Sequence, residues 1–224
     1  MKTWVVLVIA AAAMAAGVAV YLQRESRPAE PAVPVATGTA SEPVNGPLNE
    51  PANELVATLP QFQLADRDGQ LRSLQDWPDK ALIVNFWATW CAPCRREIPL
   101  LLELQREHGA EGFQVIGIAA DFRDKVLAYA DEMKIDYPLM IGEQEALDAA
   151  ASFGVEAIGF PFTVFSDRRG RVVAAHLGEL TAPQADIILA AVRRVDAGEL
   201  SPGEARRGIE AALRELPEPM SDED

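Results

Sequence analysis

The sequence predicts an α/β protein built on a mixed sheet with helices on both faces. From Leu59 onward, short apolar segments typical of strands alternate with segments whose apolar residues recur at helical spacing. Residues 82–88 form a continuous apolar run, which is typical of a strand buried on both faces. Glycine-containing turns at 68–69 and 168–170 separate short apolar runs, and they indicate a hairpin near each end of this region.

The first half of the domain is expected to hold a hairpin, two buried strands and two helices. The hairpin joins residues 62–64 to 71–74, because Asp68-Gly69 between them is a turn signal. Apolar runs predict strands at 82–88 and 113–119, with a helix between them that extends through Glu107. A second helix is predicted where apolar residues recur at helical spacing, over residues 121–134.

The second half continues the alternation and adds a helix. A strand is expected at 137–141, followed by a helix at 143–153 that Gly154 ends. Residues 162–165 and 172–176 are predicted as an antiparallel hairpin, and the next helix is expected at 182–195 with Thr181 as its N-cap. The last helix is predicted at 202–216, where Ser201 and Glu204 form a capping-box pattern, and it is expected to pack against the domain.

The N-terminal residues 1–25 are predicted to be a signal anchor. Residues 4–22 carry no charge, and at about 1.5 Å per residue this run is about 30 Å long, enough to cross a bilayer. A cleavable signal peptide usually has a shorter apolar stretch, although Gly17-Val18-Ala19 could serve as a cleavage site. We expect a single-pass protein of the bacterial inner membrane with its catalytic domain in the periplasm; a soluble periplasmic protein after cleavage is the alternative.

Proline content and charge define the rest of the organisation. Prolines recur through residues 26–58, so this stretch is expected to be an extended linker. The globular domain is then predicted at 59–197, and residues 198–224 hold the last helix and a disordered acidic tail.

Hydrophobic residues make up 49% of the chain, enough for a core, and the formal net charge is -14. That charge argues against nucleic acid as a partner, because nucleic-acid binding needs clustered basic residues.

The chain has two cysteines, Cys91 and Cys94, at the junction of a predicted strand and a predicted helix. A Cys-x-x-Cys at such a junction indicates a dithiol redox site. A c-type haem site would need histidine where Arg95 stands, and a zinc site would need His108 and His176, which lack ligand spacing. A loop this short also gains little from purely structural cross-linking. We therefore expect redox exchange, with no cofactor and no metal.

The two thiols are predicted to have different roles. Cys91 falls at the start of the helix, where unpaired N–H groups and the helix dipole favour a thiolate, so it is the candidate nucleophile. Cys94 lies one turn further in and can resolve a mixed disulfide. Pro93 narrows the conformations of the loop between them. Arg95 and Arg96 could support the thiolate, or they could simply form a solvated helix face.

Glu97 has two readings from spacing alone. It falls within the helical arc that holds Cys94 and the apolar residues, where partial desolvation would raise its pKa and allow proton exchange with Cys94. It could equally be an acid that the helix dipole favours near the N-terminus. Asn85, in the predicted buried strand, is expected to be a satisfied polar residue of the core.

These residues resemble the TlpA/ResA-like membrane-anchored disulfide reductases of the thioredoxin superfamily. The resemblance covers about residues 59–195, and its carriers are these: Phe62-x-Leu64, Asp68-Gly69, Ser73-Leu74, the run from Val84 to Glu97 that contains Trp90-Cys91-Ala92-Pro93-Cys94, Gly154-Val155, Gly159-Phe160-Pro161-Phe162-Thr163, and Asp167-x-x-Gly170. The resemblance implies a thioredoxin-like fold with an N-terminal β-hairpin, to which this chain adds the C-terminal helix.

The resemblance also implies roles for particular residues. Pro161 matches a cis-proline that faces the cysteine pair, and Phe160 before it would offer its backbone to a client by β-type pairing. Glu97 matches an acidic residue that family members place beside the dithiol. Asn85 stands where cytosolic thioredoxins have a buried Asp, a substitution that favours the exported subgroup. The catalytic residues are therefore expected to be Cys91, Cys94 and Glu97, and the client-binding residues Trp90, Pro93, Phe160 and Pro161.

The expected function is reduction of disulfides in exported client proteins, with electrons from a membrane thiol carrier and residues 4–22 in the inner membrane. A disulfide-forming oxidant and a reductase of cytochrome c maturation are alternatives with the same chemistry. The latter is weakened because its members usually have Pro-Glu where this chain has Pro161-Phe162. A non-catalytic role in metal handling or assembly is the alternative of another class.

Overall fold

The structure, a computed structural model, describes residues 55–154 and 159–217. The predicted anchor at 1–25, most of the 26–58 linker, Val155 and the acidic tail from 218 lie outside the described residues. All described residues belong to one compact unit. Among them, no helix has both the length and the apolar character needed to cross a membrane.

The described strands form one mixed sheet of seven strands in the order β2-β1-β5-β4-β3-β6-β7. Their bounds are β1 Leu64–Asp66, β2 Leu71–Arg72, β3 Ala81–Trp87, β4 Phe113–Ala120, β5 Leu139–Gly142, β6 Phe162–Ser166 and β7 Val172–Leu177. The centre, β5-β4-β3, is parallel, and the flanking pairs are antiparallel. Every residue of β3 is buried, as its continuous apolar run predicts.

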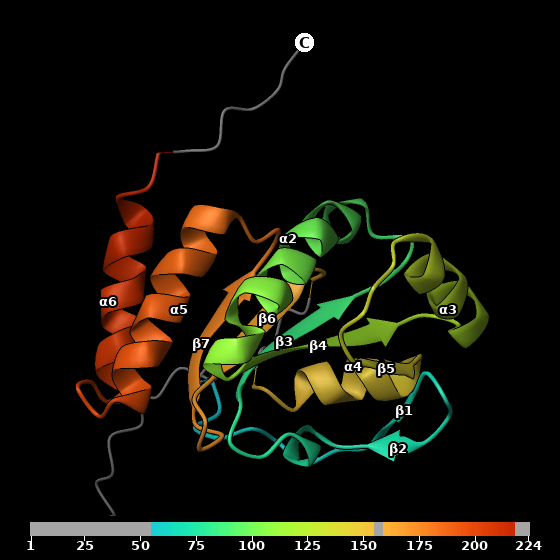
Figure 1. Cartoon of the computed structure of the whole chain (residues 1–224), viewed down its shortest axis with the longest axis horizontal. Coiled ribbons are helices and arrows are strands. Elements are labelled where there is room, and N and C mark those ends of the chain that lie inside the picture. Colours follow the sequence, from blue (N-terminus) through green and yellow to red (C-terminus); the bar gives the residue numbers. More distant parts are fainter. Residues whose placement is uncertain (1–54, 155–158, 218–224) are drawn as a thin grey trace, which may run out of the picture. The chain divides into compact units, whose positions relative to one another are not determined.

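Helices cover both faces of this sheet, as predicted (Figure 1). The helices are α2 Ala92–His108, α3 Arg123–Glu132, α4 Gln144–Ala151, α5 Ala182–Asp196 and α6 Pro202–Arg214, with short 3₁₀ turns η1 Leu74–Asp76 and η2 Gly109–Glu111. Buried residues of α2, α3, α5 and α6 share one hydrophobic cluster, whereas those of α4 and η1 belong to a second. The face under α2 is the one that carries the site.

The structure shortens some predicted elements. In the first hairpin, strand pairing ends at Arg72, because Ser73 caps η1 and its backbone N–H and hydroxyl both bond the Asp76 carboxylate. The helix predicted over 121–134 begins only at Arg123, because the Asp121 side chain is used in other contacts described below. The helix predicted over 182–195 is present as α5, with Thr181 as its N-cap and a capping box with Gln184.

The last helix, α6, packs against the domain, as predicted. Its capping box is formed: the Glu204 N–H donates to Ser201 Oγ at 3.3 Å, and the Ser201 N–H donates to the Glu204 carboxylate at 2.8 Å. Arg206 reaches β7, where it donates to Val172 O at 2.7 Å and Val173 O at 3.3 Å. Because β7 is an edge strand, α6 helps to cover that edge.

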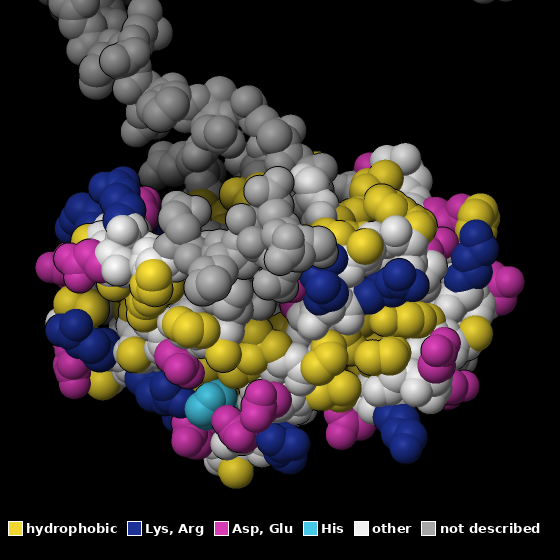
Figure 2. All heavy atoms as spheres, turned by 90° about the horizontal axis from the view of Figure 1, so that it is seen from above, with side chains coloured by type: hydrophobic (Ala, Val, Ile, Leu, Met, Phe, Trp, Pro, Cys, Tyr) yellow, Lys and Arg dark blue, Asp and Glu magenta, His cyan; other side chains and the backbone are white. Residues whose placement is uncertain are grey.

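On the face seen in Figure 2, acidic and basic side chains are interspersed among exposed hydrophobic ones. The exposed large hydrophobic residues of the described chain include Trp90, Phe122 and Leu177. Trp90 directly precedes the first cysteine, so part of this apolar exposure lies at the site.

Candidate active site

The two cysteines lie where β3 ends and α2 begins. Cys91 is the N-cap of α2, and Cys94 lies in its first turn. They form a disulfide, with 5.3 Å between their Cα atoms. The buried strand therefore delivers the pair to the N-terminal end of the helix, as the sequence predicts.

The surroundings of the two sulfurs differ. Cys91 is 5% exposed and Cys94 is fully buried. The N–H of Cys94 donates to Cys91 Sγ at 3.3 Å, and the positive end of the helix dipole also lies at this sulfur. An attacking partner can therefore reach Cys91 first, and a thiolate formed there is stabilised by the helix N-terminus.

A buried carboxylate fixes the loop before the dithiol. Asp121 follows β4 and is 6% exposed; its Oδ2 accepts from the Thr89 N–H at 3.2 Å and also from the Thr89 hydroxyl. Its Oδ1 accepts from the Phe122 N–H at 2.8 Å. Asp121 thus ties the 88–90 loop to the end of β4. The sequence predicts Asp121 only as part of a helix, because nothing in its spacing shows that it reaches Thr89.

Glu97 is buried beneath the dithiol and is 1% exposed. Its Oε1 accepts from Asn85 Nδ2 at 2.6 Å, and its Oε2 accepts from the Leu180 N–H at 2.9 Å. Burial raises the pKa of Glu97 to about 7, although both hydrogen bonds oppose that rise. Since Cys94 and Glu97 are three residues apart on α2, they share one helix face. The structure therefore favours the first of the two sequence readings, a desolvated carboxyl.

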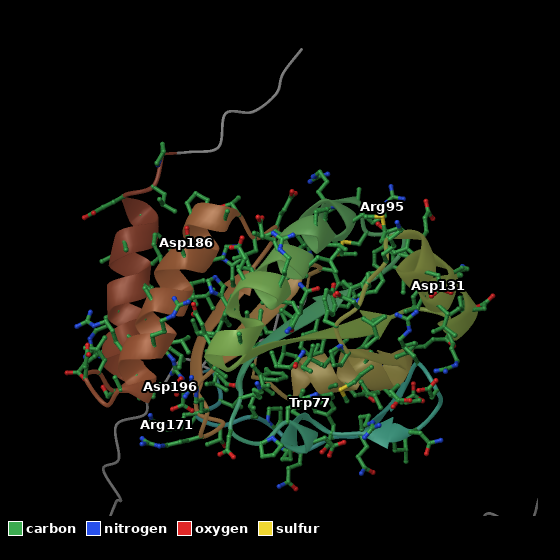
Figure 3. The ribbon with its side chains drawn as sticks, viewed as in Figure 1. Trp77, Arg95, Asp131, Arg171, Asp186 and Asp196 are labelled. Carbon is green, nitrogen blue, oxygen red and sulfur yellow. A yellow bond between two sulfur atoms is a disulfide. The ribbon has the colours of Figure 1, made fainter. Side chains whose placement is uncertain are left out.

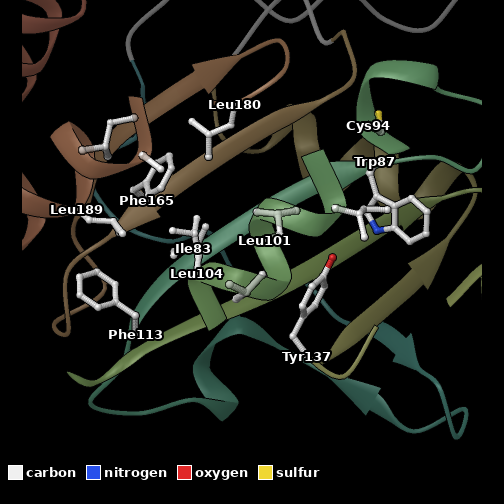
Figure 4. Packing of buried hydrophobic residues seen from close by; sticks show 14 of the residues in the cluster. Ile83, Trp87, Cys94, Leu101, Leu104, Phe113, Tyr137, Phe165, Leu180 and Leu189 are labelled. Atoms are coloured by element: carbon white, nitrogen blue, oxygen red, sulfur yellow. The ribbon is translucent and has the colours of Figure 1, made fainter. Parts of the chain in front are cut away.

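Asn85 is only half satisfied, which corrects the expectation of a satisfied core residue. Its amide nitrogen donates to Glu97 and, at 2.9 Å, to Thr163 Oγ1 on β6. Its Oδ1 has no hydrogen-bond partner among the described residues, and the same holds for Trp87 Nε1 and the Tyr137 hydroxyl. Figure 4 shows the Trp87 and Tyr137 side chains in the core under α2. The polar atoms that meet at Glu97 come from β3, from β6 through Asn85, and from the loop before α5, a grouping that sequence spacing did not reveal.

The predicted client-binding residues lie around the dithiol loop. The Phe160–Pro161 peptide bond is cis, as the resemblance implied. The Phe160 ring lies 6.1 Å from that of Trp90, which is 69% exposed. Pro93 is half-buried in the first turn of α2. Trp90, Phe160 and the neighbouring backbone thus form a surface beside the cysteines that an extended chain could contact.

The side chains of Arg95 and Arg96, which follow the dithiol, do not indicate a direct role in the chemistry. Arg96 forms a bidentate ion pair with Glu179, with its Nε 2.9 Å from Oε2 and 3.1 Å from Oε1. Arg95 is exposed, and Figure 3 places it at the same end of the molecule as the disulfide. His108 is the last residue of α2, and His176 lies in β7, within the strand that the sequence predicts.

The Redoxin family pattern matches residues 55–189. The thioredoxin-like protein YneN of Bacillus subtilis is 32% identical over 126 residues, which cover 54% of this chain and 71% of that protein. The thiol-disulfide oxidoreductase ResA of Bacillus thuringiensis is 30% identical over 126 residues, covering 56% of this chain and 70% of the relative.

A solved structure agrees with these relatives. The crystal structure of a putative thiol:disulfide interchange protein DsbE from Chlorobium tepidum superposes with a TM-score of 0.55 at 26% identity, and the match covers 62% of this chain and 98% of the other. The thioredoxin-like fold is thereby confirmed, with α6 as the extra C-terminal helix.

Proposed function

The chain belongs to the redoxin family and is a thiol–disulfide oxidoreductase, and on that premise we propose that it reduces disulfides in exported client proteins. The observation that carries the proposal is the arrangement at the start of α2, in which Cys91 at the N-cap is 5% exposed and is followed along the helix by the fully buried Cys94 and the buried Glu97.

The proposed cycle transfers two electrons to the client. The Cys91 thiolate attacks a client disulfide, so a mixed disulfide forms and one client sulfur leaves as a thiolate. The Cys94 thiolate then attacks Cys91 Sγ, which releases the second client thiolate and leaves the Cys91–Cys94 disulfide. Each released thiolate takes up a proton. The client is reduced and the chain is oxidised, so a thiol donor must reduce Cys91–Cys94 before the next cycle.

Glu97 is proposed to accept the Cys94 proton when that thiol attacks. A general base works best when its pKa lies near the working pH, and burial brings the pKa of Glu97 to about 7. A carboxyl with an ordinary pKa would be a weaker base at neutral pH. Burial also keeps its proton exchange local to the dithiol, because bulk water does not solvate the carboxyl.

The electrostatics favour a reductant over an oxidant. A strongly oxidising dithiol needs a strongly stabilised thiolate, because stabilising the reduced form raises the potential. Here Arg96 is engaged by Glu179, Arg95 faces solvent, and a nearby carboxylate at Glu97 would disfavour a second negative charge. We therefore expect a reduction potential well below about -200 mV, whereas a value near -120 mV would indicate an oxidant.

The site of action is proposed to be the periplasmic face of the inner membrane. The uncharged run at 4–22 and the proline-rich stretch at 26–58 support an anchored domain on an extended tether. A membrane thiol carrier would then supply the electrons. A blot of membrane and soluble fractions tests this part, since a cleaved protein would leave the membrane fraction.

Trapping is the test of the reductase function. A Cys94→Ser variant cannot resolve the mixed disulfide, so exported proteins should accumulate on Cys91 and be released by a reducing agent. The matched control is the double variant that also carries Cys91→Ser, which should trap nothing. Absence of trapped proteins would contradict the proposal, and full cellular function of Cys94→Ser would favour a binding role in metal handling or assembly.

The trapped proteins also separate the reductase alternatives. Clients with a Cys-x-x-Cys-His haem-attachment motif would identify cytochrome c maturation as the role. A mixture of exported proteins without that motif would indicate a general reductase.

A further inference from the structure

The loop between β7 and α5 is hydrogen-bonded both to the proposed client-binding segment and to the buried Glu97 carboxyl. The Gly178 N–H donates to Pro161 O at 2.9 Å, and this bond holds the Phe160–Pro161 segment, which lies beside the dithiol. Two residues later, the Leu180 N–H donates to Glu97 Oε2 at 2.9 Å. The side chain between them, Glu179, is held by Arg96 of α2. The loop thus contacts both the proposed client-binding segment and the buried carboxyl.

The peptide group between Glu179 and Leu180 is bonded at both ends. Its N–H donates to Glu97, and its carbonyl oxygen lies 3.3 Å from His176 Nε2. Because a carbonyl oxygen only accepts, His176 Nε2 is the donor in this contact. A single peptide group therefore separates an imidazole from the Glu97 carboxyl.

The strand register places His176 in one row of paired residues with Thr163 and Asn85. Thr163 pairs with His176 across β6 and β7, and Asn85 pairs with Thr163 across β3 and β6. Asn85 Nδ2 closes the row by donating to both Thr163 Oγ1 and Glu97 Oε1. Glu97 is thus linked to His176 through the loop peptide, and it also lies over the strand row that His176 begins.

We propose that His176 is a positioning residue for Glu97: through the peptide group between Glu179 and Leu180, the charge on the imidazole sets how readily the buried carboxyl releases its proton. The inference rests on the proposed function, because Glu97 is the group that serves the dithiol there. It adds a residue that neither spacing nor the resemblance assigned to the site.

The direction of the effect follows from the bonding. A protonated imidazole polarises the peptide group, strengthens the N–H that Glu97 accepts, and places a positive charge on the far side of it. Both effects favour the carboxylate. In return, the Glu97 carboxylate favours the protonated imidazole, whereas burial lowers the pKa of His176.

Other groups also face this pair. They are Cys94 and Arg96 from α2, Glu179 from the loop, and Tyr137 from the segment before β5, whose pKa is raised by burial and by Glu97. Arg96 and Glu179 neutralise each other as a bidentate pair. Tyr137 stays neutral across the range in which His176 and Glu97 titrate, since its pKa is raised. The imidazole is therefore the group whose charge changes near neutral pH beside Glu97.

The first experiment measures the pKa of His176 by NMR in the full-length, oxidised chain in detergent micelles, with ¹³C-labelled histidine. An ionised Glu97 raises the pKa of His176 by between about 0.4 and about 1.5 pH units, the range for unit charges about 8 Å apart at effective dielectric constants from about 80 to about 20. Because burial lowers the pKa of His176 and raises that of Glu97, part of Glu97 is protonated where the ring titrates, so Glu97→Gln should lower the pKa of His176 by at most this amount. His108 is the other histidine of the chain and contacts Arg193 and Glu111 instead, so it serves as the internal control. An equal shift at His108, or a His176 ring signal that does not respond at the pH where Glu97 ionises, would overturn the proposal.

The reverse experiment tests reciprocity. His176→Gln keeps a neutral N–H donor but removes the titrating charge, so the ¹³C-carboxyl pKa of Glu97 should rise by the same amount that Glu97→Gln lowers the pKa of His176. A rise in the Glu97 pKa that differs from the fall measured at His176 would overturn the proposal, because the coupling between two groups is reciprocal. His108→Gln is the matched control and should leave Glu97 unchanged.

Two further readouts complete the test, and the first depends neither on the folding of a variant nor on catalysis. In the unsubstituted chain, the His176 ring signal should show a second inflection at the pH where the Glu97 carboxyl signal titrates; a single inflection counts against the coupling. The pH midpoint of kcat for disulfide reduction should move upward in His176→Gln and stay fixed in His108→Gln. If Glu97→Gln leaves kcat unchanged while the NMR coupling is present, the role of Glu97 in the proposed function fails and the coupling to His176 stands.

Discussion

Replacing Glu97 by Gln should change how the stability of the oxidised protein depends on pH. Burial raises the pKa of Glu97 from 4.5 in its ordinary state to about 7 in the folded chain. Between these two values the folded state binds more protons than the unfolded state, so the free energy of unfolding falls as the pH rises. At about 1.4 kcal/mol per pH unit, the loss from pH 4.5 to pH 7 is about 3 kcal/mol. The contribution becomes constant about one pH unit above the folded-state pKa, near pH 8.

Urea unfolding of the oxidised protein at pH 5, 6, 7 and 8 measures the effect. Glutamine cannot ionise, so the free energy of unfolding of Glu97→Gln relative to wild type should increase by about 2–3 kcal/mol over this range. Glu103→Gln is a matched control on the same helix, because its side chain is half exposed and its one ion-pair partner among the described residues is Arg106. If the difference between wild type and Glu97→Gln stays the same at every pH, Glu97 titrates at its ordinary pKa and the reasoning fails.

Three further substitutions test the packing around the site. Tyr137→Phe removes a buried hydroxyl that has no partner among the described residues, so urea unfolding should show no loss of stability, or a gain of up to about 1 kcal/mol. Gly117→Ala places a Cβ 2.7 Å from Leu139 Cδ2, and the same assay should show a loss of about 1–3 kcal/mol. Arg206→Met removes both donors to the β7 edge carbonyls, so analytical ultracentrifugation should show more self-association than wild type; an unchanged monomer fraction would refute a protective role.

Local features of the sequence were sufficient to predict the unit of strand β3, the dithiol and helix α2. The apolar run of β3, the spacing of Cys91 and Cys94, and the helical arc of Glu97 depend on neighbouring residues, and the structure keeps all three. The same periodicity placed Glu97 on the buried face without showing what it bonds. Its helix position limits it to one face of α2, whereas its partners come from other elements.

The rest of the site depends on tertiary contacts that spacing cannot show. Asp121 was assigned to a helix, but its carboxylate binds Thr89 instead, because the chain returns to the dithiol loop after β4. Leu180 contributes only its N–H, and a backbone donor leaves no mark in the sequence. Asn85 was expected to be satisfied, but a residue type does not reveal that Oδ1 would lack a partner among the described residues.

The loop from Gly178 to Leu180 is expected to couple client binding to proton transfer in steady-state kinetics. One end fixes the carbonyl of Pro161, and the other fixes the Glu97 carboxyl. A substitution that shifts this loop therefore disturbs client affinity and proton transfer at once, so KM and kcat are expected to change together. Variants of this loop should accordingly be compared by single-turnover rates, in which binding and chemistry are resolved as separate phases.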